Sequence, residues 1–190
     1  MSLDCSSLPD DLPVPQDDDA ASHLAGMRLP AIFLRATNGS WVDLSELTGR
    51  IILYAYPRTG VPGEPLPNGW DGIPGARGCT PQACAWRDHR AEVAALGARV
   101  YGLSTQPTSY QREVVDRLHL PFPLLSDDAF CLTDALRMPT FEASGMRLLK
   151  RLTMVLRDGL IEQVFYPVFP SDSDASTVIS WLQGHPGYEG

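Results

Sequence analysis

The chain alternates strand-like and helix-like segments, and this alternation constrains its fold more than any other feature. The apolar run IILYAY at residues 51–56 has the length and composition of a fully buried strand. Further strand-like runs follow at 98–104 and 122–126, with helix-like segments between them. Strands that alternate with helices indicate parallel crossovers in a central sheet. The sequence therefore predicts an α/β domain with a partly parallel sheet.

Two hairpin signals add antiparallel strands to this pattern. Asn-Gly at 38–39 and Asp-Gly at 158–159 each lie between strand-like runs, the arrangement typical of tight hairpin turns. The flanking runs are AIFLRA (31–36) and WVDL (41–44) for the first turn, and the two halves of RLTMVLRDGLIEQVFYPV (151–168) for the second. Helices are predicted over residues 80–96, 108–118, 127–136 and 172–183. The expected architecture is a central mixed sheet flanked by helices, with an N-terminal β-hairpin.

Length and composition narrow the function classes. A chain of 190 residues fits one domain and buries enough core to fold without disulfide staples. It has 15 basic and 23 acidic residues, and a net charge of −8 argues against general nucleic-acid binding. No apolar run approaches the roughly 18–20 residues of a membrane helix. The sequence contains no P-loop, dinucleotide fingerprint or EF-hand loop, so we expect no cofactor and no metal.

The first 27 residues differ from the rest. They contain six aspartates, three prolines and no basic or aromatic residue, which predicts a poorly ordered acidic tail before a single domain at 28–190. A solvated extension and a partner-docking arm are both compatible with this composition. The segment lacks the basic and apolar regions of a secretory signal, so we expect a cytoplasmic protein. Cytoplasmic thiols stay reduced, and paired cysteines there are more often catalytic than structural.

Cys79 occupies a position that favours reactivity. It follows a loop at 60–78 in which ten of 19 residues are Gly or Pro, and it precedes the helix predicted over 80–96, with Thr80 as N-cap and Pro81 as first helical residue. Unpaired N–H groups at a helix N-terminus stabilise a thiolate. The alternative is an inert buried thiol. Of the other cysteines, Cys5 lies in the tail and Cys131 is interpreted as a small core residue.

The spacing of Cys79 and Cys84 has a geometric consequence. In an ideal helix, residues i and i+5 have Cα atoms ~8.7 Å apart, beyond the ~7 Å limit for a disulfide. A bond between these two residues therefore requires the first turn of the helix to unwind. His89 lies ~15 Å along the helix from Cys79, so it serves neither as the base for Cys79 nor as a shared zinc ligand.

Three segments resemble the peroxiredoxins, and specifically their Q-type or bacterioferritin-comigratory subgroup. They are YPRTG, GCTPQACAWRDH and VYGLST, and the resemblance runs from about Arg28 to Leu182. It implies a thioredoxin-like fold and a thiol peroxidase that uses no metal, haem or flavin. By this resemblance Cys79 is the peroxidatic thiolate, which becomes a sulfenic acid. Cys84 is the resolving cysteine, which forms an intramolecular disulfide with Cys79.

The resemblance also suggests which polar groups serve the thiolate. The arginine that precedes a strand in the family corresponds to Arg151 in RLTMVL, with Arg58, Arg77 and Arg147 as rivals. The family hydroxyl three residues before the reactive cysteine is replaced here by Ala76, because about 15 residues are inserted into the motif. Thr59 is the candidate to supply that hydroxyl in space. The insertion is either a lid or a surface loop, with Trp70 as an apolar wall.

The resemblance implies partners and leaves alternatives. The substrates are hydrogen peroxide and small organic hydroperoxides, and the electrons come from thioredoxin or a similar dithiol. The protein is expected to be a monomer or a homodimer. One alternative is a one-cysteine peroxidase in which Cys84 is structural. Another is a non-enzymatic thiol redox sensor on the same fold. A protein disulfide oxidoreductase is disfavoured by the five-residue spacing of the cysteines.

Overall fold

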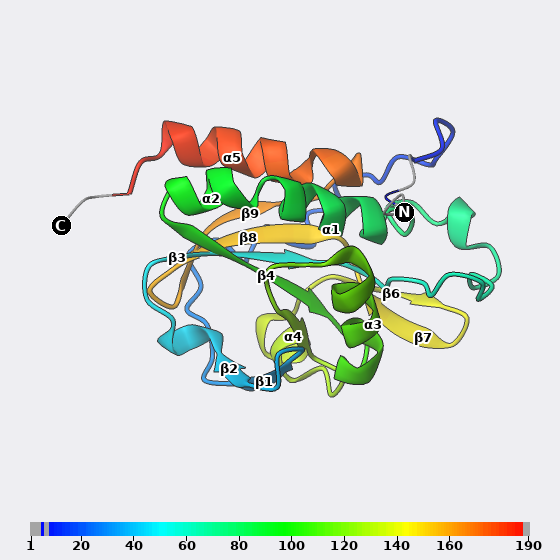
Figure 1. Ribbon diagram of the computed structural model, residues 1–190, viewed down its shortest axis with the longest axis horizontal. Helices are drawn as coiled ribbons and strands as arrows, with labels where there is room; N and C mark the ends of the chain where they lie inside the picture. The colour runs from blue at the N-terminus through cyan, green and yellow to red at the C-terminus, as the bar shows by residue number, and fades with distance from the viewer. Residues whose placement is uncertain (1–4, 6–7, 188–190) are drawn as a thin grey trace.

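A mixed seven-stranded sheet forms the centre of the molecule (Figure 1). The computed structural model describes residue 5 and residues 8–187. The strand order is β2-β1-β5-β4-β3-β8-β9, in which β5, β4 and β3 are parallel and the remaining neighbours pair antiparallel. The strands are β1 (Phe33–Ala36), β2 (Trp41–Asp43), β3 (Arg50–Ala55), β4 (Ala98–Ser104), β5 (Leu124–Ser126), β8 (Leu152–Arg157) and β9 (Leu160–Phe165). The predicted mixed sheet and both predicted hairpins are confirmed.

The interior strand β3, which lies between β4 and β8, separates two apolar layers. All six of its residues are buried, as the run IILYAY predicts. Ile52 and Tyr54 belong to one core cluster, and Ile51 and Leu53 belong to the other. Successive side chains of a strand point to opposite faces, so the apolar residues that follow Arg50 must be covered on both sides of the sheet. The helices supply this cover.

The helices divide unequally between the two faces. They are α1 (Cys79–Asp88), α2 (Arg90–Ala95), α3 (Thr108–Leu118), α4 (Cys131–Leu136) and α5 (Asp174–Gly184), with short 3₁₀ turns η1 (Leu44–Glu46), η2 (Trp70–Gly72) and η3 (Ser171–Ser173). Residues of α1, α2, α3 and α5 share the core cluster of Ile52, whereas α4 shares the cluster of Ile51. Figure 1 shows α1 and α5 lying side by side, and they contact each other directly. Helix α1 therefore packs on the same face of the sheet as α5 and against it.

The helix predicted over 80–96 is in fact two helices. It begins at Cys79 rather than after an N-cap at Thr80, and it is interrupted at His89, which ends α1 and precedes α2. The His89 Nδ1 atom lies 2.9 Å from the backbone oxygen of Ala85. The backbone N–H of His89 donates to the same oxygen, so the ring and the main chain use one acceptor. Such local side-chain bonding competes with a continuous helix. The N-cap position belongs to Gly78, whose φ of 105° is left-handed.

A second, two-stranded sheet lies outside the predicted elements. It consists of β6 (Thr140–Ala143) and β7 (Met146–Leu149), joined by Ser144 and Gly145, both at positive φ. The Ser-Gly dipeptide is a turn signal that could have revealed this hairpin. Cys131 also differs from its interpretation as a core residue. It is exposed at the first position of α4, whose buried face is formed by Leu132 and Leu136.

The N-terminal segment packs against the domain. The composition predicts a poorly ordered tail through residue 27, but in residues 8–27 Ala21 and Leu24 are buried in the core. Asp18 accepts hydrogen bonds from Lys150 Nζ and Tyr166 Oη, each at 2.6 Å. Composition missed these contacts because their partners lie more than 100 residues away in sequence. In residues 5 and 8–187, no helix combines the length and apolar character needed to span a bilayer.

Candidate active site

Cys79 is the first residue of α1, and neighbouring side chains leave no room for a side chain at Gly78, the residue before it. A Cβ built on Gly78 would lie 2.1 Å from Ser171 Oγ and 2.9 Å from Leu8 Cδ2. The left-handed φ and this close approach both require glycine there. The turn places Cys79 in the first turn of α1, where backbone N–H groups lack helical partners. Cys79 is a free, buried thiol.

Arg151 lies against the Cys79 sulfur. Its Nη2 atom is 3.3 Å from Cys79 Sγ and also donates to the backbone oxygens of Gly75, Ala76 and Arg77 at 3.1–3.3 Å. The side chain is buried, and its Nη1 donates to Gln82 Oε1. Within the described residues no carboxylate lies within salt-bridge distance of this guanidinium. The arginine thus places a buried guanidinium, which is always charged, directly against the thiol sulfur.

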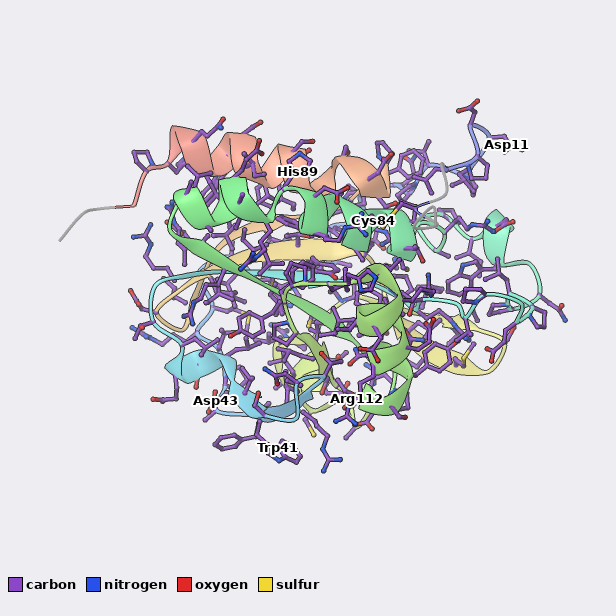
Figure 2. All side chains as sticks on the ribbon, in the orientation of Figure 1. Asp11, Trp41, Asp43, Cys84, His89 and Arg112 are labelled. Atoms are coloured by element: carbon purple, nitrogen blue, oxygen red, sulfur yellow. A yellow bond between two sulfur atoms is a disulfide. The ribbon has the colours of Figure 1, made fainter. Side chains whose placement is uncertain are left out.

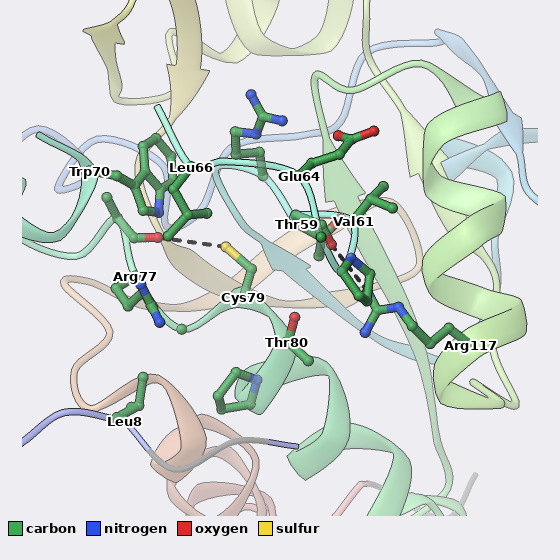
Figure 3. Close-up of a pocket in the computed structure, with 17 residues that line it drawn as sticks. Leu8, Thr59, Val61, Glu64, Leu66, Trp70, Arg77, Cys79, Thr80 and Arg117 are labelled. Carbon is green, nitrogen blue, oxygen red and sulfur yellow. Dashed lines mark hydrogen bonds between the residues drawn. The ribbon is translucent and has the colours of Figure 1, made fainter. Parts of the chain in front are cut away.

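The cysteine opens into a pocket of about 270 Å³. Figure 3 shows the sulfur pointing from the helix N-terminus toward the loop that carries Leu66 and Trp70. Trp70 is buried and lines the pocket, as its predicted role as an apolar wall requires. The inserted loop therefore forms a wall of the cysteine pocket. The thiol donates to the backbone oxygen of Ala76 at 3.7 Å, drawn as a dashed line in Figure 3.

Thr59 lines the same pocket, but its hydroxyl is engaged elsewhere. Its Oγ1 donates to Gln106 Oε1 at 3.2 Å, and its backbone N–H donates to the same oxygen at 2.9 Å. The amide of Gln106 returns a bond from Nε2 to the Thr59 backbone oxygen at 3.1 Å. A hydroxyl retains acceptor capacity while it donates. Thr59 thus lines the pocket with its oxygen available as an acceptor.

The rival arginines make other contacts. Arg147 pairs with Asp134 at 2.7 Å, and Arg77 pairs with Asp71 at 2.6 Å. Arg58 lines the pocket, and its Nη2 donates to Tyr110 Oη at 3.2 Å. Among the described arginines, Arg151 alone has a hydrogen bond to the Cys79 sulfur.

The buried carboxylate of Asp174 holds residues that pack behind Arg151 and Cys79. Asp174, at the start of α5, accepts through Oδ2 from Gln82 Nε2 at 2.7 Å, Trp86 Nε1 at 2.9 Å and Thr153 Oγ1 at 2.8 Å. Burial raises the pKa of Asp174, and these three donors act in the opposite direction. Because Gln82 also accepts from Arg151, the network links the buried arginine to α5 and to both halves of α1. Sequence analysis did not identify Asp174, since nothing in the local sequence marks it.

Two tyrosines of β3 and its C-terminal end lie beneath α1. Burial raises the pKa of Tyr56 and of Tyr54, and a negative charge on Cys79 acts in the same direction. Tyr54 stacks on Trp86 with ring centroids 5.9 Å apart. These phenols therefore stay neutral, and they pack in the same core cluster as Cys79.

Cys84 is bonded to Cys5 rather than to Cys79. The Cα atoms of Cys5 and Cys84 are 6.2 Å apart across the disulfide, and the helix that carries Cys84 and Cys79 is continuous. Cys84 lies within α1, with His89 at its end (Figure 2). Sequence analysis gave Cys5 no role, because a cysteine five residues from the N-terminus carries no pairing signal. No group of three His, Cys, Asp or Glu side chains suited to a metal ion occurs in residues 5 and 8–187.

Known proteins match this chain over most of its length. Residues 24–179 match the Redoxin family. The chain is 29% identical over 160 residues to putative peroxiredoxin Q, chloroplastic, of Oryza sativa subsp. indica, which covers 83% of this chain and 66% of the rice protein. It is 28% identical over 166 residues to peroxiredoxin Bcp of Escherichia coli, which covers 85% of this chain and 96% of that protein. The chain thus spans about two thirds of the plant relative and nearly all of the bacterial one.

A solved structure gives the same result for the fold. The crystal structure of peroxidoxin BcpB from Mycobacterium tuberculosis superposes with a TM-score of 0.68 at 25% identity, covering 84% of this chain and 96% of that one. This confirms the predicted thioredoxin-like arrangement of a mixed sheet flanked by helices. Since the Redoxin match covers most of the residues and the relatives are Q-type proteins, the chain belongs to the Redoxin family, as a Q-type peroxiredoxin.

Proposed function

We propose that this peroxiredoxin reduces hydrogen peroxide and small organic hydroperoxides, with the Cys79 thiolate as nucleophile. The contact of 3.3 Å between Arg151 Nη2 and Cys79 Sγ carries the proposal. A guanidinium at that position favours the thiolate and stabilises the negative charge that develops on the leaving oxygen. The pocket of about 270 Å³ has room for a small peroxide, and Leu66 and Trp70 give its alkyl group an apolar wall.

The first half-reaction consumes the peroxide. The Cys79 thiolate attacks one oxygen of the O–O bond, an S–O bond forms and the O–O bond breaks. The second oxygen leaves with the bonding electron pair and takes up a proton, to become water or an alcohol. Cys79 is oxidised to a sulfenic acid and the peroxide is reduced.

The second half-reaction returns the enzyme to the thiol state. The Cys84 thiol attacks the sulfenic sulfur, water leaves, and a Cys79–Cys84 disulfide forms. This step requires the first turn of α1 to unwind, because five helical residues hold the Cα atoms too far apart. Thioredoxin or a similar dithiol then reduces the disulfide. We place this cycle in the cytoplasm, where such dithiols keep protein thiols reduced.

The test is peroxide consumption by the reduced protein. We expect Cys79→Ser to lower the second-order rate with hydrogen peroxide by roughly 10³-fold or more, because the nucleophile is removed. Cys131→Ser is the matched control, since Cys131 is an exposed free thiol remote from the pocket residues. Equal rates for the two variants would contradict the proposal.

Turnover with thioredoxin and its reductase separates the alternative mechanisms. We expect Cys84→Ser to consume the first equivalent of peroxide and then to lose sustained turnover. Undiminished turnover of Cys84→Ser would support a one-cysteine peroxidase. A wild-type protein that reacts stoichiometrically but does not turn over would support a redox sensor.

A further inference from the structure

The Cys5–Cys84 disulfide coexists with a folded active site. Helix α1 is continuous from Cys79 to Asp88, and Cys79 remains a thiol in contact with Arg151. The Cα separation of 6.2 Å between Cys5 and Cys84 lies within the ordinary disulfide range. By contrast, a Cys79–Cys84 bond is incompatible with the same helix. An oxidised Cys84 is therefore compatible with an intact pocket only when its partner is Cys5.

The surroundings of Cys5 favour a reactive thiol. Arg87, one turn after Cys84 on α1, has its Nη2 atom 3.5 Å from the Cys5 sulfur. The guanidinium is held in place by Leu118, whose backbone oxygen accepts from Arg87 Nη1 at 2.9 Å, and by the carboxylate of Asp88 at 2.8 Å from Nε. A neighbouring cation stabilises a cysteine thiolate, the form that attacks disulfides.

Residues 8–18 of the N-terminal segment contact the domain at several places near Cys79 and Arg151. Leu8 lines the Cys79 pocket, and Pro15 lies 3.6 Å from the position of a Cβ on Gly75. Asp18 is bonded to Lys150, next to Arg151 in the chain. Hydrogen bonding to Lys150 and Tyr166 lowers the pKa of Asp18 to about 2, so this anchor is ionised at neutral pH. Anchoring at residues 8–18 holds Cys5 at a high effective concentration near α1.

The three cysteines differ in how far an external reductant is able to reach them. Cys79 and Cys84 are both buried, at 5% and 3% exposure, whereas Cys5 is only partly buried. An external dithiol must reach a sulfur atom in line with the disulfide that it attacks. Cys5 is the most accessible sulfur among these three.

We propose that Cys5 is a third redox cysteine, which accepts the disulfide from Cys79 and presents it to the reductant. The step rests on the proposed peroxidase function. The Cys5 thiolate attacks the Cys84 sulfur of the Cys79–Cys84 disulfide, a Cys5–Cys84 bond forms, and Cys79 leaves as a thiolate. The exchange involves no net oxidation. The external dithiol afterwards reduces Cys5–Cys84 to two thiols and is itself oxidised to a disulfide.

One consequence is that Cys79 regains its thiolate before any reductant arrives. Helix α1 refolds, Arg151 again contacts the sulfur, and a second peroxide is able to react. We therefore expect wild-type protein without reductant to consume about two equivalents of peroxide rapidly, the second of which leaves Cys79 as a sulfenic acid. Cys5→Ser is expected to consume about one, because its Cys79–Cys84 disulfide persists.

The decisive experiment follows the disulfides in time. Reduced protein is mixed with one equivalent of hydrogen peroxide, quenched in acid at intervals, alkylated and mapped by peptide mass spectrometry. We expect wild type to form Cys79–Cys84 first and Cys5–Cys84 later, with Cys79 becoming alkylatable again. Cys5→Ser is expected to stop at Cys79–Cys84. Cys131→Ser is the matched control and is expected to behave as wild type.

The outcomes separate the relay from the peroxidase proposal. Wild type that ends as Cys79–Cys84 with Cys5 alkylatable would overturn the relay and leave the peroxidase proposal standing. A Cys5–Cys84 bond that forms equally fast in Cys79→Ser would also overturn the relay, because the bond would not derive from Cys79. If Cys79 stays a thiol in wild type and in every cysteine variant, the peroxidase proposal itself fails.

Discussion

Cys79 and Cys84 lie on one helix, five residues apart, and both are buried in the same core cluster, but their sulfur atoms have different partners. The Cys79 sulfur has a buried guanidinium at 3.3 Å and opens into a pocket. Cys84 packs in the core and is bonded to the N-terminal segment. A step of five residues turns about 140° around a helix, so the two sulfurs point to different neighbours. One helix thus holds the proposed site of peroxide attack apart from the cysteine that is bonded to the N-terminal segment.

Among changes that keep every cysteine, the largest effect on the peroxide reaction is expected at Arg151, the cation beside Cys79. We expect Arg151→Lys to lower the rate of peroxide reaction by about 10²-fold, because an ammonium cannot reproduce the fork whose Nη2 contacts the sulfur and the loop oxygens while its Nη1 donates to Gln82. Arg147→Lys, at an exposed pair with Asp134, is the control and should retain the wild-type rate. Stopped-flow fluorescence with hydrogen peroxide measures both. Equal losses in the two variants would remove the special status of Arg151.

Asp174 accepts hydrogen bonds from Gln82 and Trp86 of α1, the helix that carries Cys79 and Cys84. Its loss is therefore expected to destabilise the packing of this helix. In Asp174→Ala the buried donors of Gln82, Trp86 and Thr153 lose their acceptor. We expect the free energy of unfolding at neutral pH to fall by about 2–3 kcal/mol, as measured in urea. The exposed neighbour Asp172 is the control position, and Asp172→Ala should change the free energy by less than about 0.5 kcal/mol.

The pH dependence of stability tests the same carboxyl group. Burial raises the pKa of Asp174 above the ordinary value of 3.8 in the folded chain. Its contribution to stability is therefore fully present below pH 3.8 and is lost as the pH rises through the higher folded value. Asp174→Asn has no such titration. We expect its urea midpoint to fall less than that of wild type from pH 4 upward, and parallel profiles would contradict this assignment.

A smaller effect is expected at the Cys84 side. Arg87→Gln removes the cation beside Cys5, and we expect the transfer from Cys79–Cys84 to Cys5–Cys84 to slow by roughly three- to tenfold. Sulfenic acid formation at Cys79 should keep its rate, because Arg87 does not line the pocket. Quench-flow with thiol alkylation measures both steps, and Arg90→Gln, an exposed neighbour, is the control. A slower first step would indicate a general disturbance of α1.

Much of the fold was predictable because its signals are local. The run IILYAY became the fully buried β3, and the Asn-Gly and Asp-Gly pairs became hairpin turns. The β6–β7 hairpin was missed because its strands are short and its turn, at Ser144 and Gly145, is less distinctive. The break at His89 was missed because it depends on a ring position that periodicity does not report.

The site was predictable only in part, for a related reason. The loop and helix around Cys79 and Trp70 predicted roles for these two residues. Arg151 was suggested because its segment RLTMVL resembles the family pattern of an arginine before a strand. Asp174 has no local signature, since its role comes from three donors on two other elements. Thr59 was expected as a hydroxyl donor near the cysteine. Its bond to Gln106 is a long-range contact that the sequence does not encode locally.

The sequence by itself determined the strands of the central sheet, the place of Cys79 between a Gly/Pro-rich loop and a helix, and the impossibility of bonding it to Cys84 within a folded helix. These follow from short-range geometry, which the chain carries along its own length. Only the tertiary structure decided that Cys5 is bonded to Cys84 and that the Arg87 guanidinium lies beside the Cys5 sulfur. Residues 79 apart in sequence are joined by packing against a shared core, and packing depends on all the elements together.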